Sequence, residues 1–170
     1  LGALFYGAIY TIWLKRKSIW NIVIGGLAGS FATLAGSAAV NPIIAPEAVI
    51  LSVILFLWTP PHFWSLAMAI GDDYEKAGIP MLPNTLSNSL TTYIILSHTI
   101  ILVFVTALLM LYSSSLFYIF AIFIGGGYFI WTSILLAIKK TKSAAMKKYF
   151  GSFVQLGLLL ILIIIDGVVV

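Results

Sequence analysis

The chain has 170 residues, 62% of them hydrophobic and only 8% charged, whereas a soluble domain usually carries about 25% charged residues. This composition excludes an ordinary soluble globule, a disordered chain and a nucleic-acid-binding protein, and the lack of cysteine excludes disulfides and cysteine-ligated metal sites. The net charge of +4 comes from nine basic and five acidic residues, and most basic residues fall in two short clusters, which is typical of membrane-orientation signals.

Continuous apolar runs of about 20 residues predict helices that cross a lipid bilayer. These runs do not alternate in polarity as the strands of a membrane barrel would, and helices pair their own backbone groups in lipid. The run at 1–14 begins inside an apolar stretch without an initiating Met, so we expect it to be the tail of a truncated span. The expected fold class is an all-α, polytopic transmembrane bundle with this partial span and five complete ones. The complete spans are expected at 21–40, 48–70, 91–112, 116–138 and 150–170.

The segments between the spans alternate between two sides of the membrane. One side receives a basic turn at 15–17, a polar loop at 71–90 and a basic loop at 139–149. The other side receives a turn at 41–47 and a serine turn at 113–115. The basic residues gather on the first side, which the positive-inside rule makes the cytoplasmic side. The basic clusters either set this orientation alone or also bind an anionic group.

Three of the five acidic residues, Asp72, Asp73 and Glu75, crowd into the polar loop at this face. Carboxylates so close together raise one another's pKa unless a cation neutralises them. Mg²⁺ commonly takes one or two carboxylates together with the oxygens of a bound phosphate. The cluster therefore predicts either a Mg²⁺–diphosphate site or a solvated acidic loop.

The span at 48–70 carries a polar residue near its middle. His62 lies about ten residues before the acids, which is roughly 15 Å along a helix or half the depth of the membrane. Pro60 and Pro61 directly before it remove backbone donors, so we expect a kink that interrupts this span. A histidine at this depth is costly in lipid and faces a cavity or a partner. Its imidazole could contact a haem, transfer a proton or hydrogen-bond to another helix.

Four motifs stand in order along the sequence. They are Tyr10-Thr11 with Leu14-Lys15-Arg16, then Asn21-Ile22-Val23-Ile24-Gly25-Gly26, then Trp58-Thr59-Pro60-Pro61-His62-Phe63-Trp64, then Asp73-Tyr74 with Ala77-Gly78-Ile79-Pro80-Met81-Leu82-Pro83. Together they resemble the protohaem IX farnesyltransferase family, within the intramembrane aromatic prenyltransferase superfamily. The resemblance runs from Tyr10 to about Asp166 and is most specific in the middle of the chain.

The resemblance implies a fold and a reaction. The family's members have nine helices, so residues 1–170 would form the C-terminal part of a single transmembrane prenyltransferase domain, with the last six helices. The implied reaction joins farnesyl diphosphate and water to a vinyl group of haem B, giving haem O and diphosphate, with Mg²⁺ as cofactor. The implied location is the bacterial inner membrane, or the mitochondrial one in a eukaryote, with the active face cytoplasmic. Besides the lipid bilayer, the candidate partners are haem A synthase or the terminal-oxidase assembly.

The resemblance also implies site residues at the cytoplasmic face. Lys15 and Arg16 would bind the diphosphate oxygens, and Asn21 stands beside them, where it could reach the same group. Asp73, with Asp72 next to it, would be the catalytic and metal-binding pair. A second set would line the haem and prenyl cavity and complete the catalytic residues: Trp58, His62, Phe63, Trp64 and Tyr74.

The sequence departs from the family pattern in ways that keep other functions open. An earlier acidic motif of the family is absent, so half of the expected metal site is not in this chain. The stretch 31–37 lacks the usual Pro-Pro pair and Gly-Trp, and 70–71 lacks the basic residue often seen before the Asp-Tyr pair. The alternatives are a prenyltransferase for a quinone precursor or other aromatic acceptor, a transporter or channel fragment, and an inactive assembly partner.

Overall fold

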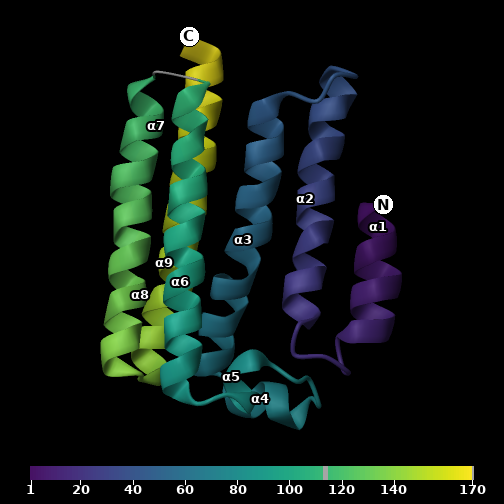
Figure 1. Ribbon diagram of the computed structural model, residues 1–170, viewed down its shortest axis with the longest axis vertical. Helices are drawn as coiled ribbons and strands as arrows, with labels where there is room; N and C mark the ends of the chain where they lie inside the picture. The colour runs from purple at the N-terminus through teal and green to yellow at the C-terminus, as the bar shows by residue number, and fades with distance from the viewer. Residues whose placement is uncertain (113–114, 170) are drawn as a thin grey trace.

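The computed structural model describes residues 1–112 and 115–169, and within these residues it contains helices and no strands (Figure 1). Within the described residues, five helical segments are long and apolar enough to cross a membrane, which confirms the expected fold class; two of them combine several of the elements named below (α6 with η2, and α7 with η3 and α8). In chain order the elements are α1 (Gly2–Leu4), η1 (Phe5–Leu14), α2 (Asn21–Val40), α3 (Pro46–Ala69), α4 (Gly71–Lys76), α5 (Leu82–Thr85), α6 (Asn88–Ala107), η2 (Leu108–Leu111), α7 (Leu116–Phe120), η3 (Ala121–Gly126), α8 (Gly127–Lys139) and α9 (Lys142–Val169).

The helix α3 is continuous, so the span is not divided at its prolines, and the kink expected there stays a prediction. The helix runs from Pro46 to Ala69 with Pro60 and Pro61 inside it, and both prolines are buried. A membrane helix tolerates proline where nearby side chains pair the freed backbone groups. The Thr59 hydroxyl, directly before the prolines, donates to the Leu55 carbonyl oxygen over 2.8 Å, so it is paired within its own helix.

The helix α9 begins earlier than expected, so the basic loop at 139–149 is shorter than the sequence predicted. The helix starts at Lys142, and only 140–141 separate it from α8. The segment that follows contains no Pro or Gly before Gly151, so nothing in it stops a helix. Lys147 and Lys148 therefore lie within α9, on different faces, with Lys147 exposed and Lys148 completely buried.

The polar loop at 71–90 is also partly helical. It contains α4 and α5, and α6 begins at Asn88, where the Ser87 hydroxyl accepts a hydrogen bond from the Leu90 backbone N–H. Such an N-cap pairs one of the free donors at a helix start. Of the expected serine turn at 113–115, Ser113 and Ser114 lie outside the described residues, as does the last residue of the expected span at 150–170.

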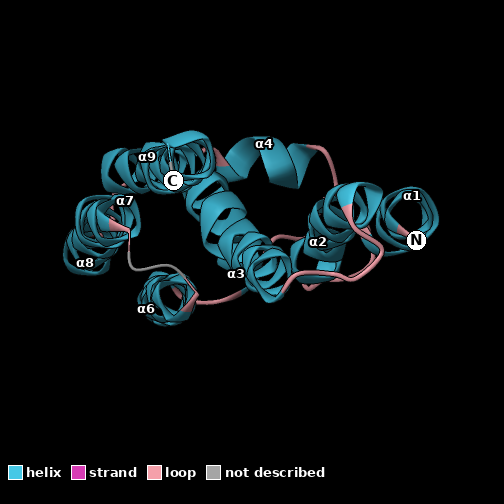
Figure 2. Ribbon diagram, turned by 90° about the horizontal axis from the view of Figure 1, so that it is seen from above, coloured by secondary structure: helices cyan, strands magenta, loops and turns pink. Residues whose placement is uncertain are grey.

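The helix α3 occupies the centre of the bundle, between α2 on one side and α6 and α9 on the other (Figure 2). Small residues bring α2 close to α3, as is common between membrane helices. A Cβ added at Gly26 would lie 3.2 Å from Thr59 Cβ, and the Ser30 hydroxyl donates to the Ser52 carbonyl oxygen over 2.8 Å. The central helix is thus fixed by close backbone approach as well as by apolar packing.

A buried lysine joins α6, α8 and α9. The Lys148 ammonium donates to Thr99 Oγ1 over 3.0 Å and to the Phe129 carbonyl oxygen over 3.2 Å, and it lies over the Phe129 ring. The Ser133 hydroxyl donates to the same Thr99 oxygen over 2.9 Å. Polar contacts of this kind between membrane helices contribute about 0.6 kcal/mol each on average. Three elements therefore converge on one cation.

We expect Lys148→Ala to destabilise the bundle by about 2 kcal/mol or more, because it removes these contacts and leaves a cavity. The matched control is Lys147→Ala on the same helix, whose exposed ammonium only covers Trp131 at 4.5 Å and should contribute about 0.5–1 kcal/mol. The measurement is the free energy of unfolding in detergent micelles. Equal losses in the two variants would show that the buried cation does not hold the three helices together.

Candidate functional site

Three charged segments lie at one end of the bundle. The turn after η1, the helices α4 and α5, and the start of α9 lie together there, whereas the α2–α3 turn lies at the opposite end (Figure 1). This arrangement follows from the alternating direction of the spans, and it confirms that the segments expected at 15–17, 71–90 and 139–149 share one end, although most of the last is the start of α9. The candidate site is therefore built at a membrane surface by residues far apart in the sequence.

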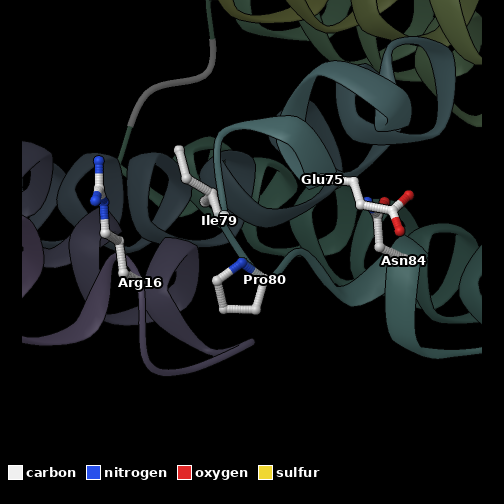
Figure 3. Close-up of a pocket in the computed structure, with 6 residues that line it drawn as sticks. Arg16, Glu75, Ile79, Pro80 and Asn84 are labelled. Atoms are coloured by element: carbon white, nitrogen blue, oxygen red, sulfur yellow. The ribbon is translucent and has the colours of Figure 1, made fainter.

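A cleft of about 340 Å³ separates the basic turn from the segment that joins α4 to α5. Arg16 forms one side of it, Glu75 and Asn84 form the other, and Ile79 and Pro80 lie between them (Figure 3). Gly78 also lines the cleft, and its φ of +65° is a left-handed conformation that favours glycine. The cleft thus places a guanidinium opposite a carboxylate at the mouth of the bundle.

The side chain of Asn21 lies beneath this cleft rather than in it. It is completely buried, and its Nδ2 donates to the Pro80 carbonyl oxygen over 2.8 Å and to the Lys15 carbonyl oxygen over 3.3 Å. Both amide hydrogens are therefore used to tie the basic turn to the 77–81 segment. Asn21 thus links the turn that carries Arg16 to the segment that carries Ile79 and Pro80.

The three acids have different surroundings. Asp72 accepts a hydrogen bond from the Lys142 ammonium over 2.9 Å, and this bond and the lysine charge lower the pKa of the Asp72 carboxyl. Both side chains are exposed, so this ion pair contributes little to stability. Glu75 lines the cleft with Arg16, whereas Asp73 is exposed to water on α4. The sequence predicts a single cluster of three acids, whereas only Glu75 of the three lines this cleft.

These carboxylates fit a magnesium ion only as part of its ligand set. Within residues 1–112 and 115–169, no three His, Asp or Glu side chains converge on one point. Mg²⁺ keeps several waters and commonly binds through one or two carboxylates plus substrate phosphates. Asp72 and Asp73 are both exposed on α4, and Lys142 already engages Asp72. They do not form a complete cage for a metal.

Tyr74 is held between the acidic helix and the core. It is half-buried and packs against the cluster that contains Trp64, Met81 and Leu82. Burial raises the pKa of the Tyr74 hydroxyl, so it is a neutral hydrogen-bonding group at neutral pH. Its neighbour in the motif, Asp73, points to water instead. The pair therefore combines an exposed charge with an anchored ring.

The aromatic residues around His62 divide into three environments. Phe63 lines an apolar cleft of about 250 Å³ with Tyr6, Tyr10 and residues of α2 and α3. Trp58 stacks on the His62 ring, with 4.0 Å between the ring centroids. Trp64 is completely buried in the core cluster. The structure therefore places Phe63 at an open cleft, Trp58 beside the histidine and Trp64 in the core.

The histidine is bound from a helix that sequence reasoning did not connect to it. His62 Nδ1 lies 2.6 Å from the Ser152 hydroxyl of α9, and the Trp58 ring N–H donates to the Ser152 carbonyl oxygen over 3.0 Å. The rings of Tyr149 and Phe153 also contact the imidazole. Ser152 lies in an apolar span with no motif around it, so only the fold could reveal its role.

The chain is similar to known proteins over nearly its whole length. The model of a family described as the UbiA prenyltransferase family matches residues 1–156. A relative from Paramagnetospirillum magneticum, named protoheme IX farnesyltransferase 2, is 51% identical over 98% of this chain and 58% of its own length. A relative from Roseiflexus castenholzii, named protoheme IX farnesyltransferase, is 42% identical over 99% of this chain and 32% of its own length.

A third relative has the same printed name and comes from Neorickettsia sennetsu. It is 40% identical over 98% of this chain and 55% of its own length. The chain thus spans between about a third and three-fifths of the length of these curated relatives. No solved structure matches the chain.

Proposed function

The chain belongs to the UbiA prenyltransferase family, and from this premise we propose that the whole protein transfers a farnesyl group from farnesyl diphosphate to a vinyl group of haem B. Water is the third reactant, and haem O and diphosphate are the products. The observation that carries the proposal is the match, over nearly the whole chain, to relatives named protoheme IX farnesyltransferase. The charged cleft at one end of the bundle supports it.

The basic wall of the cleft would bind the diphosphate. Arg16 lines the cleft, and a guanidinium suits the paired oxygens of a phosphate group. Lys15 lies directly before Arg16 in the same turn and would add a second positive charge. Asn21 would act as a positioning residue, because its two hydrogen bonds fix this turn against the 77–81 segment.

The acidic helix would serve the leaving group through a metal ion. Asp73, with Asp72 beside it, would hold Mg²⁺ at the water-facing end of the bundle. When bound, the ion supplies Lewis-acid stabilisation of the charge that develops on the departing diphosphate. Tyr74 would hold the acidic helix against the core, since its ring packs there.

The apolar surfaces suit the two organic substrates. The cleft at Phe63 has a volume of about 250 Å³ and an aromatic wall, which is the kind of lining that binds an isoprenoid chain. Aromatic faces also favour a developing carbocation. We propose that Trp58, His62, Phe63 and Trp64 form or support the wall of this cavity. The charged end would face the cytoplasm, because nearly all of the basic residues lie there.

The test of the proposed function asks which acceptor takes the farnesyl group. The 170-residue chain is joined to the part of the Paramagnetospirillum relative that it does not match, and its membranes receive labelled farnesyl diphosphate with haem B or with a quinone precursor. We expect label on haem B only. Label on the quinone precursor instead would assign another aromatic acceptor, and cation uptake without label transfer would assign a transporter.

A further inference from the structure

Two very short contacts meet at the hydroxyl of Ser152. Its oxygen lies 2.6 Å from His62 Nδ1 and 2.6 Å from the Tyr149 carbonyl oxygen, one turn earlier in α9. A carbonyl oxygen can only accept a hydrogen bond. A serine hydroxyl carries one hydrogen, so it can donate to only one of these two neighbours.

Counting the hydrogens fixes the roles. If the hydroxyl donated to His62, its oxygen would face the Tyr149 carbonyl oxygen at 2.6 Å with no hydrogen between two acceptors. If the hydroxyl donates to Tyr149 and His62 Nδ1–H donates to the hydroxyl, both contacts are hydrogen bonds. We propose that Ser152 is a positioning residue that holds neutral His62 with its proton on Nδ1 and leaves Nε2 as the free acceptor.

The surrounding rings prevent the imidazole from turning away from this arrangement. His62 is only 4% exposed, and Trp58 stacks on it with planes 19° apart. Trp58 is itself tied to Ser152 by the bond from its ring N–H to the serine carbonyl oxygen. Phe63 and Phe153 meet the imidazole edge to face. A flip of the ring would break the Nδ1 bond and disturb this packing.

The free nitrogen has a consequence for the reaction, and this step rests on the proposed function. Within residues 1–112 and 115–169, no hydrogen bond is made to His62 Nε2. In the proposed transfer the C–O bond of farnesyl diphosphate breaks, and diphosphate leaves with the electron pair. The vinyl π electrons form the new C–C bond, and water adds to the resulting cation. The water must then lose one proton, and a neutral imidazole whose Nε2 is free is a group that can accept it.

The tautomer can be measured without any substrate. The 170-residue chain is labelled with ¹⁵N-histidine in lipid nanodiscs, and the spectra show which ring nitrogen carries the proton; His98→Gln assigns the two histidines. We expect the proton of His62 on Nδ1 in the parent chain and in Ser152→Thr, and a shift toward Nε2 in Ser152→Ala. The control is Ser133→Ala, which removes a buried serine that bonds Thr99 rather than His62.

Two spectra would overturn the assignment. One is a parent chain, or Ser152→Thr, with the proton of His62 on Nε2, and this outcome decides the matter even if Ser152→Ala does not fold. The other is an unchanged His62 spectrum in a folded Ser152→Ala. Both results are independent of whether haem is the acceptor.

Activity then tests the proton step in the joined protein. Ser152→Ala should lower kcat by about tenfold to a hundredfold, as loss of an orienting partner commonly does, with little change in KM for farnesyl diphosphate. Ser152→Thr should restore kcat. If haem O forms at the normal rate in Ser152→Ala, Nε2 is not the proton acceptor. If no variant and no parent forms haem O, the proposed function fails while the tautomer assignment stands on the spectra.

Discussion

Asp73→Asn should abolish magnesium-dependent prenyl transfer in the joined protein. The substitution keeps the size of the side chain and removes the negative charge that a magnesium ion requires of its ligand. Asp73 is exposed on α4 and has no described ion-pair partner, so the change should leave the bundle intact. The measurement is haem O formed over a range of Mg²⁺ concentrations.

The neighbouring Asp72 provides the matched comparison for Asp73→Asn. Asp72→Asn removes a carboxylate that Lys142 already engages, and we expect a smaller loss than for Asp73→Asn. Melting temperatures of both variants would verify that the fold is kept. Full activity of Asp73→Asn at every Mg²⁺ concentration would remove Asp73 from the metal site and with it the assignment of the acidic helix.

Arg16→Ala should weaken the binding of farnesyl diphosphate about tenfold to a hundredfold, with kcat nearly unchanged at saturation. Hydrogen bonds to charged groups contribute about 1.5–3 kcal/mol, and 1.4 kcal/mol corresponds to a factor of ten in affinity. Lys15→Ala should have an effect in the same direction. The measurement is KM for farnesyl diphosphate at constant haem B.

The matched control is Lys17→Ala, which removes an exposed charge from the same turn without touching the lining of the cleft. Its KM should stay within about twofold of the parent's, because an isolated surface charge contributes little. Equal increases in KM for Arg16→Ala and Lys17→Ala would mean that only the overall charge of the turn matters. A normal KM in Arg16→Ala would exclude the cleft as the diphosphate site.

The sequence predicted those helices best whose ends carry strong local signals. The span at 21–40 matches α2 at both ends, because a basic turn precedes it and Asn41-Pro42 follows it. The partial span at 1–14 likewise ends at Lys15, where the charged turn begins. In both cases a local change from apolar to polar residues coincides with the membrane surface.

The last helix was harder to predict because its charged residues do not all face water. The segment 139–148 is as rich in lysine as a loop, yet Lys148 points into the bundle and donates hydrogen bonds to acceptors on α6 and α8. A long aliphatic stem lets such a side chain pack in the interior while its ammonium is bonded. The acceptors come from other spans, so no pattern within the segment reveals them.

In the candidate site, too, the sequence predicted what depends on neighbours along the chain and missed what depends on contacts between distant helices. The sequence located His62 near aromatic residues and gathered the charges at one face, because these facts depend on neighbours along the chain. The partner Ser152 lies 90 positions away, and Asn21 meets the carbonyl of Pro80 across 59 positions. Such contacts are decided by helix packing. The sequence therefore indicates the chemistry of the site but not the residues that orient it.

The most direct measurement of the central claim is the haem content of membranes that contain the joined protein. Haem is extracted from cells supplied with haem B and farnesyl diphosphate, separated by chromatography and identified by mass spectrometry. The Asp73→Asn form of the joined protein and the 170-residue chain alone are analysed in parallel. A haem O peak from the joined protein that is lost in Asp73→Asn is the predicted result. Haem B as the only species in every sample, with the joined protein present and folded in the membrane, would contradict the proposed function.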